Sequence, residues 1–125
     1  MICVSLQAET ADQALAGMRE ARGAGADLVE LRGDHLKDPL TLPSIVTARM
    51  IPVLVTIRPA WEGGRWTGSE EDRIRLLREA CAAGAEYIDV EFKAYKDFPR
   101  AAAHLVLSYH DFDKTPAALE SIAGK

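Results

Sequence analysis

Short apolar runs rich in β-branched residues alternate along the chain with longer stretches rich in alanine and charged residues. The short runs have the length and residue types of β-strands, and the longer stretches have those of helices. This alternation is typical of a parallel sheet whose strands are joined by crossover helices, so we predict an α/β fold. Two helices are predicted at residues 10–22 and 69–82. The predicted strands are residues 2–7, 27–32, 52–58, 86–91 and 105–110.

Residues at the ends of the two predicted helices support their placement. Thr10 is a favourable N-cap, and Ser69 is followed three residues later by Asp72 in an arrangement close to a capping box. The segments GADLVELR and GAEYIDVE, which begin at Gly25 and Gly84, resemble each other. Each opens with a glycine that suits the end of a helix, which indicates a repeated βα unit.

Polar residues occupy alternate positions at the C-terminal end of every predicted strand. Strands covered on both faces are normally apolar throughout, so these polar residues need a reason. Side chains two positions apart share a face, and in a closed barrel this face would point inward at the mouth where barrel enzymes build their active sites. The pairs are Ser5 and Gln7, Glu30 and Arg32, Thr56 and Arg58, Asp89 and Glu91, and Ser108 and His110.

The residue types in these pairs indicate a site for an anionic small molecule. Arg32 and Arg58 present guanidinium groups that match a carboxylate. His110 is the candidate proton carrier, because a histidine beside carboxylates can titrate near neutral pH. Glu62 lies in the long glycine-rich segment 59–68 and is a candidate to orient the His110 ring.

Some of these charged residues have an alternative, purely structural interpretation. Glu30 with Arg32, or Asp89 with a neighbouring cation, could form internal salt bridges that support the barrel without touching a ligand. His35 and His104 lack comparable charged neighbours in the pattern, and we interpret both as structural. Both interpretations stay open at the level of sequence.

Composition restricts the classes of function. The chain has 125 residues, which we expect to form one domain, and its net charge of -4 disfavours binding to nucleic acid. No basic leader opens the sequence, and its longest apolar run is too short to cross a membrane. Cys3 and Cys81 lie far apart and are interpreted as buried reduced thiols, so we expect a cytoplasmic protein. No nucleotide or metal motif is present, so we expect neither a cofactor nor a metal.

Three motifs resemble one enzyme family. ELRGDH at residues 30–35, TIRPAWEGG at 56–64 and SYHDFDKTP at 108–116 are similar, in order and spacing, to type I 3-dehydroquinate dehydratase. The resemblance implies a (β/α) TIM-type barrel, of which this chain would form about five of the eight βα units. It also implies conversion of 3-dehydroquinate to 3-dehydroshikimate in the shikimate pathway, through a Schiff base between a lysine and the substrate ketone.

The resemblance also implies roles for individual residues. Glu30, Arg32 and Arg58 match residues that hold the substrate. His110 matches the general acid and base that removes the proton beside the imine and later protonates the leaving hydroxyl, and Glu62 matches the carboxylate that orients this histidine.

The sequence departs from the family pattern at the lysine. In the family it lies on the strand after the helix that begins near Thr115, and the sequence given stops within that helix at Lys125. We therefore expect the chain alone to be close to inactive, with a relocated Schiff base on Lys93 as a less favoured alternative. An open sheet of five units needs a cover, which predicts a homodimer or a complementing half-barrel chain. A non-catalytic dimeric binding or scaffold protein is the alternative function.

Overall fold

A computed structural model describes residues 1–91 and 104–108 of the chain. The predictions made for His110 and Lys93 lie outside these residues. The described strands are β1 (Cys3–Leu6), β2 (Leu28–Arg32), β3 (Val53–Thr56), β4 (Tyr87–Glu91) and β5 (His104–Ser108). The helices are α1 (Ala11–Gly23), α2 (Leu42–Thr47) and α3 (Glu70–Ala82), with 3-10 turns η1 (Gly33–His35), η2 (Pro39–Thr41) and η3 (Ala60–Glu62).

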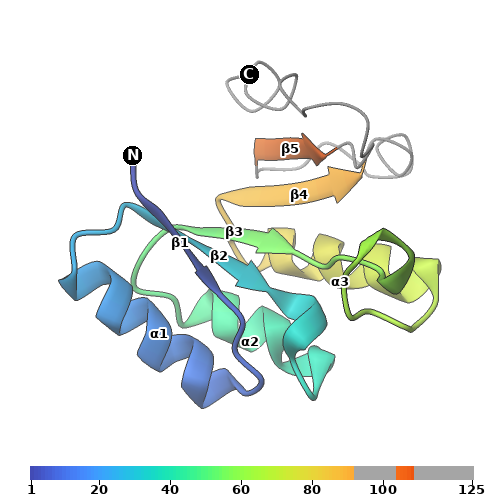
Figure 1. Ribbon diagram of the computed structural model, residues 1–125, viewed down its shortest axis with the longest axis horizontal. Coiled ribbons are helices and arrows are strands. Elements are labelled where there is room, and N and C mark those ends of the chain that lie inside the picture. The colour runs from blue at the N-terminus through green and yellow to red at the C-terminus, as the bar shows by residue number, and fades with distance from the viewer. Residues whose placement is uncertain (92–103, 109–125) are drawn as a thin grey trace.

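The strands form one parallel sheet in the order β1-β2-β3-β4-β5, so each strand lies beside the one before it in the chain. In a doubly wound sheet the order in which strands are added reverses at one point, so that some consecutive strands are not neighbours. In a (β/α) barrel each strand is added beside the one before it. The three helices lie together on one side of β1, β2 and β3 (Figure 1). The architecture is therefore a partial (β/α) barrel, as predicted.

Local sequence signals placed α1 and α3 correctly. The side chain of Thr10 accepts a hydrogen bond from the backbone N–H of Gln13, and Ser69 Oγ accepts one from Asp72 N at 3.0 Å. Gly25 and Gly84, which follow the two helices, have φ values of 94° and 111°. The predicted caps are confirmed, and the strand bounds differ from the prediction by a few residues.

Helix α2 was not predicted. It has six residues, includes Pro43 in its first turn and follows the 3-10 turn η2 directly. A helix of this length is too short to show a 3.6-residue period in the sequence. Its residues Leu42, Ile45 and Val46 are almost completely buried, so tertiary packing rather than local preference maintains it.

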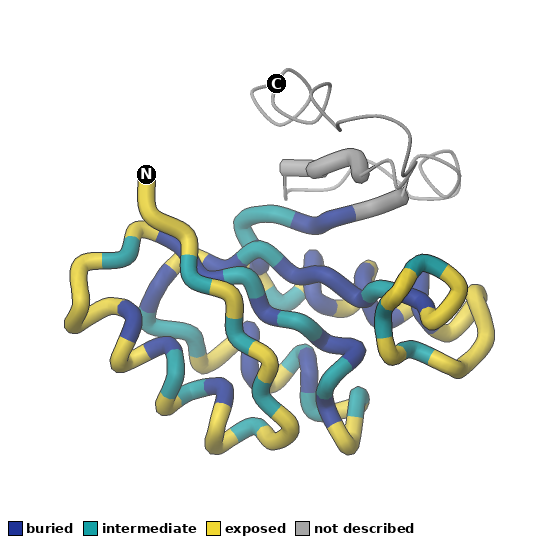
Figure 2. The backbone as a smooth tube through the Cα atoms, in the orientation of Figure 1, coloured by how far each residue is buried: buried dark blue, intermediate teal, exposed yellow. Residues whose placement is uncertain are grey.

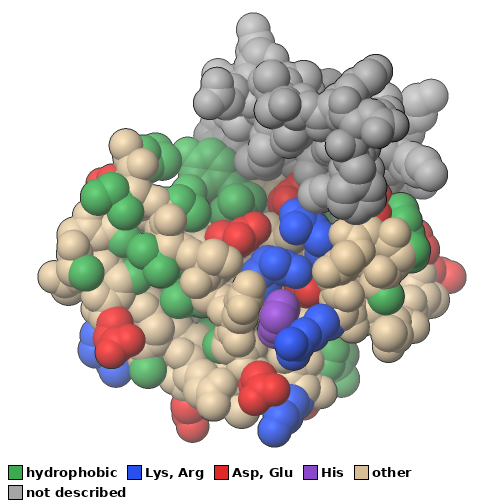
Figure 3. Space-filling view, in the orientation of Figure 1, with side chains coloured by type: hydrophobic (Ala, Val, Ile, Leu, Met, Phe, Trp, Pro, Cys, Tyr) green, Lys and Arg blue, Asp and Glu red, His purple; other side chains and the backbone are tan. Residues whose placement is uncertain are grey.

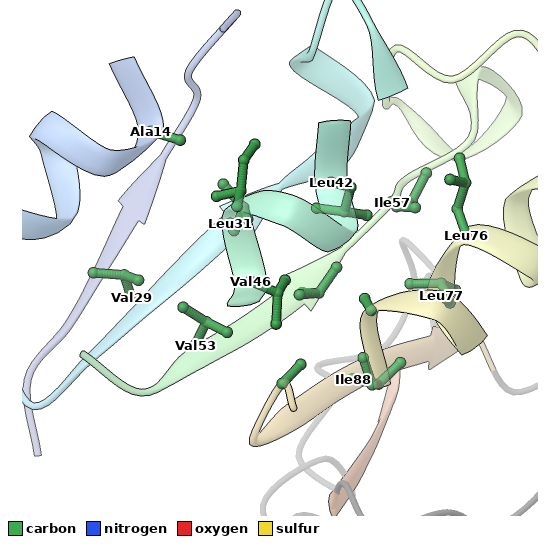
Figure 4. Close-up of a cluster of buried hydrophobic side chains, with 14 of the residues drawn as sticks. Ala14, Val29, Leu31, Leu42, Val46, Val53, Ile57, Leu76, Leu77 and Ile88 are labelled. Carbon is green, nitrogen blue, oxygen red and sulfur yellow. The ribbon is translucent and has the colours of Figure 1, made fainter. Parts of the chain in front are cut away.

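The core lies between the sheet and the helices. Val29 and Leu31 of β2 and Val53 of β3 point towards the helices (Figure 4). These three residues and Val55 of β3 are fully buried (Figure 2). Leu77 of α3 and the buried residues of α2 pack against them. Each such side chain contributes about 1.5–3 kcal/mol of hydrophobic stabilisation. The alternate strand residues therefore face the opposite side, which becomes the barrel interior.

At the N-terminal ends of the strands, the two repeated segments use an acidic residue in the same way. Asp27 Oδ2 accepts a hydrogen bond from the backbone N–H of Ile2 at 2.8 Å, and Glu86 Oε1 accepts one from Val53 N at 3.0 Å. In each case the carboxylate precedes one strand and binds the main chain at the start of the strand before it in the sequence. The repeat seen in the amino-acid sequence is therefore also a repeat in the structure.

The two cysteines differ from the prediction in part. Both thiols are free and Cys81 is buried, but Cys3 is exposed because it lies on the face of β1 that is turned away from the helices. Among the residues described, no helix combines the length and apolar character needed to cross a membrane.

Candidate functional site

A row of hydrogen-bonded polar side chains crosses four neighbouring strands on the barrel-interior face. Ser5 Oγ lies 3.0 Å from Glu30 Oε1, and Thr56 Oγ1 lies 2.9 Å from Glu30 Oε2. Thr56 Oγ1 also lies 3.4 Å from Asp89 Oδ2; its one hydroxyl proton serves one carboxylate at a time, and Glu30 is the nearer. The predicted gathering on one face is confirmed for Ser5, Glu30, Thr56 and Asp89, while the side chains of Glu91 and Ser108 lie outside the description.

The strand register produces this row. Ser5 pairs with Glu30 across β1 and β2, and Arg32 pairs with Thr56 across β2 and β3. Because the strands are parallel and in close register, polar residues near their C-terminal ends fall at similar heights. Glu30 therefore receives a hydroxyl from the strand on each side.

Arg58 lies directly beyond β3 and contacts the acid of the next strand. Its Nη2 atom is 3.7 Å from Asp89 Oδ2, and Asp89 is only 8% exposed. The internal ion pair considered for Asp89 is confirmed, with Arg58 as the cation. The partnership balances the buried carboxylate and keeps the guanidinium on the interior face.

Arg32 pairs with Asp34 and not with Glu30, so that alternative is wrong. Arg32 Nε donates to Asp34 Oδ1 at 3.0 Å and Nη2 donates to Oδ2 at 2.8 Å, a two-point contact that fixes the plane of the guanidinium. The hydrogen bond to Asp34 raises the pKa of Arg32, with smaller contributions from the charges of Glu30 and Asp89. The register places Arg32 opposite Thr56, whose hydroxyl lies between Glu30 and Asp89.

The row and the two arginines beside it form one cluster of charged and polar side chains. Asp34 belongs to this cluster, and sequence analysis missed it. Its side chain is completely buried, and Oδ2 also accepts a hydrogen bond from the backbone N–H of Arg65 at 3.1 Å. Burial alone would raise the pKa of Asp34, but the Arg32 and Arg65 hydrogen bonds outweigh it and hold the pKa below the ordinary value. The available signal was its position two residues after Arg32 in ELRGDH, at a turn where side chains no longer alternate.

His35 does have charged neighbours, contrary to the premise of its structural interpretation, and that interpretation itself stays a prediction. His35 Nε2 lies 3.9 Å from Asp34 Oδ2, and its side chain is 10% exposed. Burial lowers the pKa of His35, and the charges of Arg32 and Arg65 lower it further, while Asp34 opposes them. The charge of Asp34 is the largest of these opposing influences, but burial outweighs it. Of His104 the structure describes only its place at the start of β5.

The segment 59–68 folds back on the end of β3. Ala60 N donates to Trp66 O at 2.9 Å, and Trp66 N donates to Arg58 O at 3.2 Å. A Cβ atom on Gly64 would lie 2.0 Å from Arg58 O, so only glycine permits this approach. The turn η3 in this segment carries Glu62, which is half-buried. His110 lies outside the described residues, so its predicted contact with Glu62 stays a prediction.

The cluster combines fixed charges of both signs. Figure 3 shows basic side chains and a histidine beside acidic side chains in the middle of one face. Glu30 and Asp89 can accept hydrogen bonds from hydroxyls, while Arg32 and Arg58 can donate to a carboxylate. In the described part of the chain, no group of three His, Cys, Asp or Glu residues is placed to hold a metal ion. The arrangement suits a small molecule that carries both hydroxyl and carboxylate groups.

Comparison with known proteins agrees with the fold and the motifs. Residues 2–124 match the family model Type I 3-dehydroquinase. Across 98% of this chain, the 3-dehydroquinate dehydratases of Desulfotalea psychrophila and Methanococcus maripaludis are 41% and 37% identical, and the matches cover 56% and 59% of those proteins.

Solved structures give the same result. The 3-dehydroquinate dehydratase of Enterococcus faecalis superposes with a TM-score of 0.74 at 30% identity, covering 95% of this chain and 57% of that one. The Geobacillus kaustophilus enzyme gives a TM-score of 0.76 at 27% identity, covering 92% of this chain and 51% of that one. The chain spans a little over half the length of the curated relatives it matches. Family model, relatives and solved structures coincide, and the chain belongs to the type I 3-dehydroquinase family.

Proposed function

We propose that residues 1–125 supply the substrate-recognition half of a 3-dehydroquinate dehydratase, a lyase of aromatic amino acid biosynthesis that eliminates water from 3-dehydroquinate. The observation that carries the proposal is the row of Ser5, Glu30, Thr56 and Asp89 with Arg32 and Arg58 beside it. Hydroxyl acceptors and carboxylate donors on one edge fit a polyhydroxy acid. The names of the relatives supply the identity of that acid.

In this proposal Glu30, Arg32 and Arg58 contact the substrate. His110 removes the proton beside the imine and then protonates the hydroxyl that leaves as water, and Glu62 orients its ring. The burial of Glu62 in a segment held against Arg58 O is consistent with that role. The Schiff-base lysine belongs to the part of the relatives that this chain does not match.

The barrel-interior face needs a partner surface. We propose that it is covered by the remaining βα units, in the same polypeptide or in a complementing chain, or by a second copy of this chain in a homodimer. The exposure of Ser5 and Cys3 on this face supports a cover of some kind. We also place the protein in the cytoplasm, because Cys81 is a buried free thiol.

The direct test is turnover of 3-dehydroquinate, followed by the ultraviolet absorbance of the conjugated product. Residues 1–125 would be assayed alone and joined to the C-terminal portion of the M. maripaludis relative. The joined protein should dehydrate 3-dehydroquinate, His110→Ala should abolish this activity, and the chain alone should be close to background. A joined, folded protein with no activity contradicts the proposal.

Two further measurements separate the alternatives for the chain alone. Borohydride reduction in the presence of 3-dehydroquinate would leave a mass adduct on Lys93 if that residue forms a Schiff base. Isothermal titration with 3-dehydroquinate should release heat if the recognition half is intact. The absence of both signals in a dimeric protein favours a scaffold.

A further inference from the structure

Asp34 joins the parts of the candidate site that come from separate segments. Its carboxylate accepts the Nε and Nη2 groups of Arg32 at 3.0 and 2.8 Å, and the backbone N–H of Arg65 at 3.1 Å. The backbone N–H of Arg58 also stabilises its charged form. One buried carboxylate therefore connects the end of β2 with the segment that carries Glu62.

The contact restricts how Arg32 can meet a ligand. A guanidinium presents its N–H groups as a planar fork, and the edge formed by Nε and Nη2 is bound to Asp34. A ligand must then approach Arg32 from the side of Nη1. Without Asp34 the side chain would regain its rotamers, and binding would have to fix them again.

The same carboxylate holds the segment 59–68. The bond from Arg65 N is made to a side chain from another βα unit, while most other backbone bonds of this segment are made within it or to Arg58. Loss of a buried charged acceptor leaves the Arg65 N–H without its partner. This contact joins the segment that carries η3 and Glu62 to the end of β2, in addition to the bond from Trp66 N to Arg58 O.

We propose that Asp34 is a positioning residue: it presents Arg32 to the ligand in one orientation and docks the segment 59–68 beside it. The substrate class in this proposal rests on the proposed function. Asp34 itself makes no contact with substrate, since its side chain is fully buried. Its action on binding runs through Arg32, and its action on turnover runs through the segment that carries Glu62.

The first experiment measures kcat and KM for 3-dehydroquinate in the assembled enzyme, with Asp34→Asn compared against Asp38→Asn. Asp38 is an exposed carboxylate in the same β2–α2 connection that caps Leu40 N at 3.1 Å, so it is a matched control. We expect Asp34→Asn to raise KM about tenfold or more and to lower kcat, because the uncharged amide holds the guanidinium weakly. Asp38→Asn should change neither constant by more than about twofold.

A double-mutant cycle separates positioning from general destabilisation. In an Arg32→Gln background, Asp34→Asn should raise KM by less than about twofold, because the side chain through which it acts is already gone. Its effect on kcat should persist. A tenfold rise in KM that is independent of Arg32 would overturn the proposal. Asp34→Glu keeps the charge but shifts it by one methylene, so its KM should lie between those of wild type and Asp34→Asn. It replaces Asp34→Asn in the cycle if that variant does not fold.

A second readout needs no substrate. The two tryptophans of the chain, Trp61 and Trp66, both lie in the segment 59–68, so tryptophan fluorescence reports on its docking. Asp34→Ala removes the acceptor of the Arg65 N–H and should increase acrylamide quenching, while Asp38→Ala leaves it unchanged. Equal quenching in a folded Asp34→Ala protein overturns the docking. If the wild type fails to turn over 3-dehydroquinate, the proposed function is contradicted, and the quenching arm still decides whether Asp34 docks the segment.

Discussion

The two ends of the sheet use carboxylates in different ways. At the N-terminal ends of the strands, Asp27 and Glu86 accept hydrogen bonds from main-chain N–H groups of the strand before them in the sequence. At the C-terminal ends, Glu30 accepts from the hydroxyls of Ser5 and Thr56, and Asp89 lies beside Arg58. Both ends carry acids at regular positions, yet the partners are main-chain groups at one end and side chains at the other.

The difference separates an end whose acids bind the main chain from an end whose acids bind side chains. A main-chain N–H at the start of a strand has a fixed direction, so an acid bound to it fixes the position of that strand. Side-chain hydroxyls and the Arg58 guanidinium can rotate towards a ligand and exchange one partner for another. The same residue type therefore supports the fold at one end and, in the proposed function, contributes to a recognition surface at the other.

The largest effect that would test this contrast is the loss of a guanidinium at the C-terminal end. Arg58→Met should raise KM for 3-dehydroquinate about 10- to 100-fold in the assembled enzyme, because a hydrogen bond to a charged group is worth about 1.5–3 kcal/mol. The free energy of unfolding should also fall, by about 1–3 kcal/mol, because the buried Asp89 carboxylate loses its cation, so the effect on recognition is taken from KM of the folded protein. Steady-state kinetics and urea unfolding of one preparation measure both. An unchanged KM would remove Arg58 from the recognition surface.

The matched change at the N-terminal end should lower stability without changing KM. Arg49 donates to Glu86 through Nε at 3.0 Å and Nη2 at 2.9 Å, and to Val46 O through Nη1 at 2.9 Å. Arg49→Met should lower the free energy of unfolding by about 1 kcal/mol, reduced from the value for a buried pair because water can reach Glu86. KM should stay within about twofold of wild type. The loss of unfolding free energy is measured as a shift in the urea midpoint at constant slope. A larger effect on KM than on this free energy would contradict the contrast between the two ends of the sheet.

The smallest effect concerns the pH dependence of stability. Burial lowers the pKa of His35, so between its folded and ordinary values the unfolded chain binds more protons than the folded one. His35 therefore reduces stability as the pH falls below about 6.5, its ordinary pKa. We expect His35→Asn to flatten the fall in unfolding free energy between neutral and mildly acidic pH. Comparison with wild type removes the contributions of the other two histidines, and an identical pH slope in both proteins would show that His35 is not desolvated.

Much of the fold follows from local sequence. The caps at Thr10 and Ser69 and the glycines at 25 and 84 were sufficient to place α1 and α3, because each supplies or permits a specific backbone interaction. Helix α2 lacked such signals and is maintained by burial of Leu42, Ile45 and Val46. Where local preferences are strong the sequence was enough, and where packing decides it was not.

The candidate site divides in the same way. The alternation of polar residues in the strands determined, by itself, that Ser5, Glu30, Thr56 and Asp89 share one face, because the two-residue period of a strand leaves no other arrangement. Only the tertiary structure decided that Arg32 binds Asp34 instead of Glu30, and that His35 lies beside that pair. The period ends where β2 turns into η1, and beyond that point the partner of a charged group depends on how the loops fold against each other.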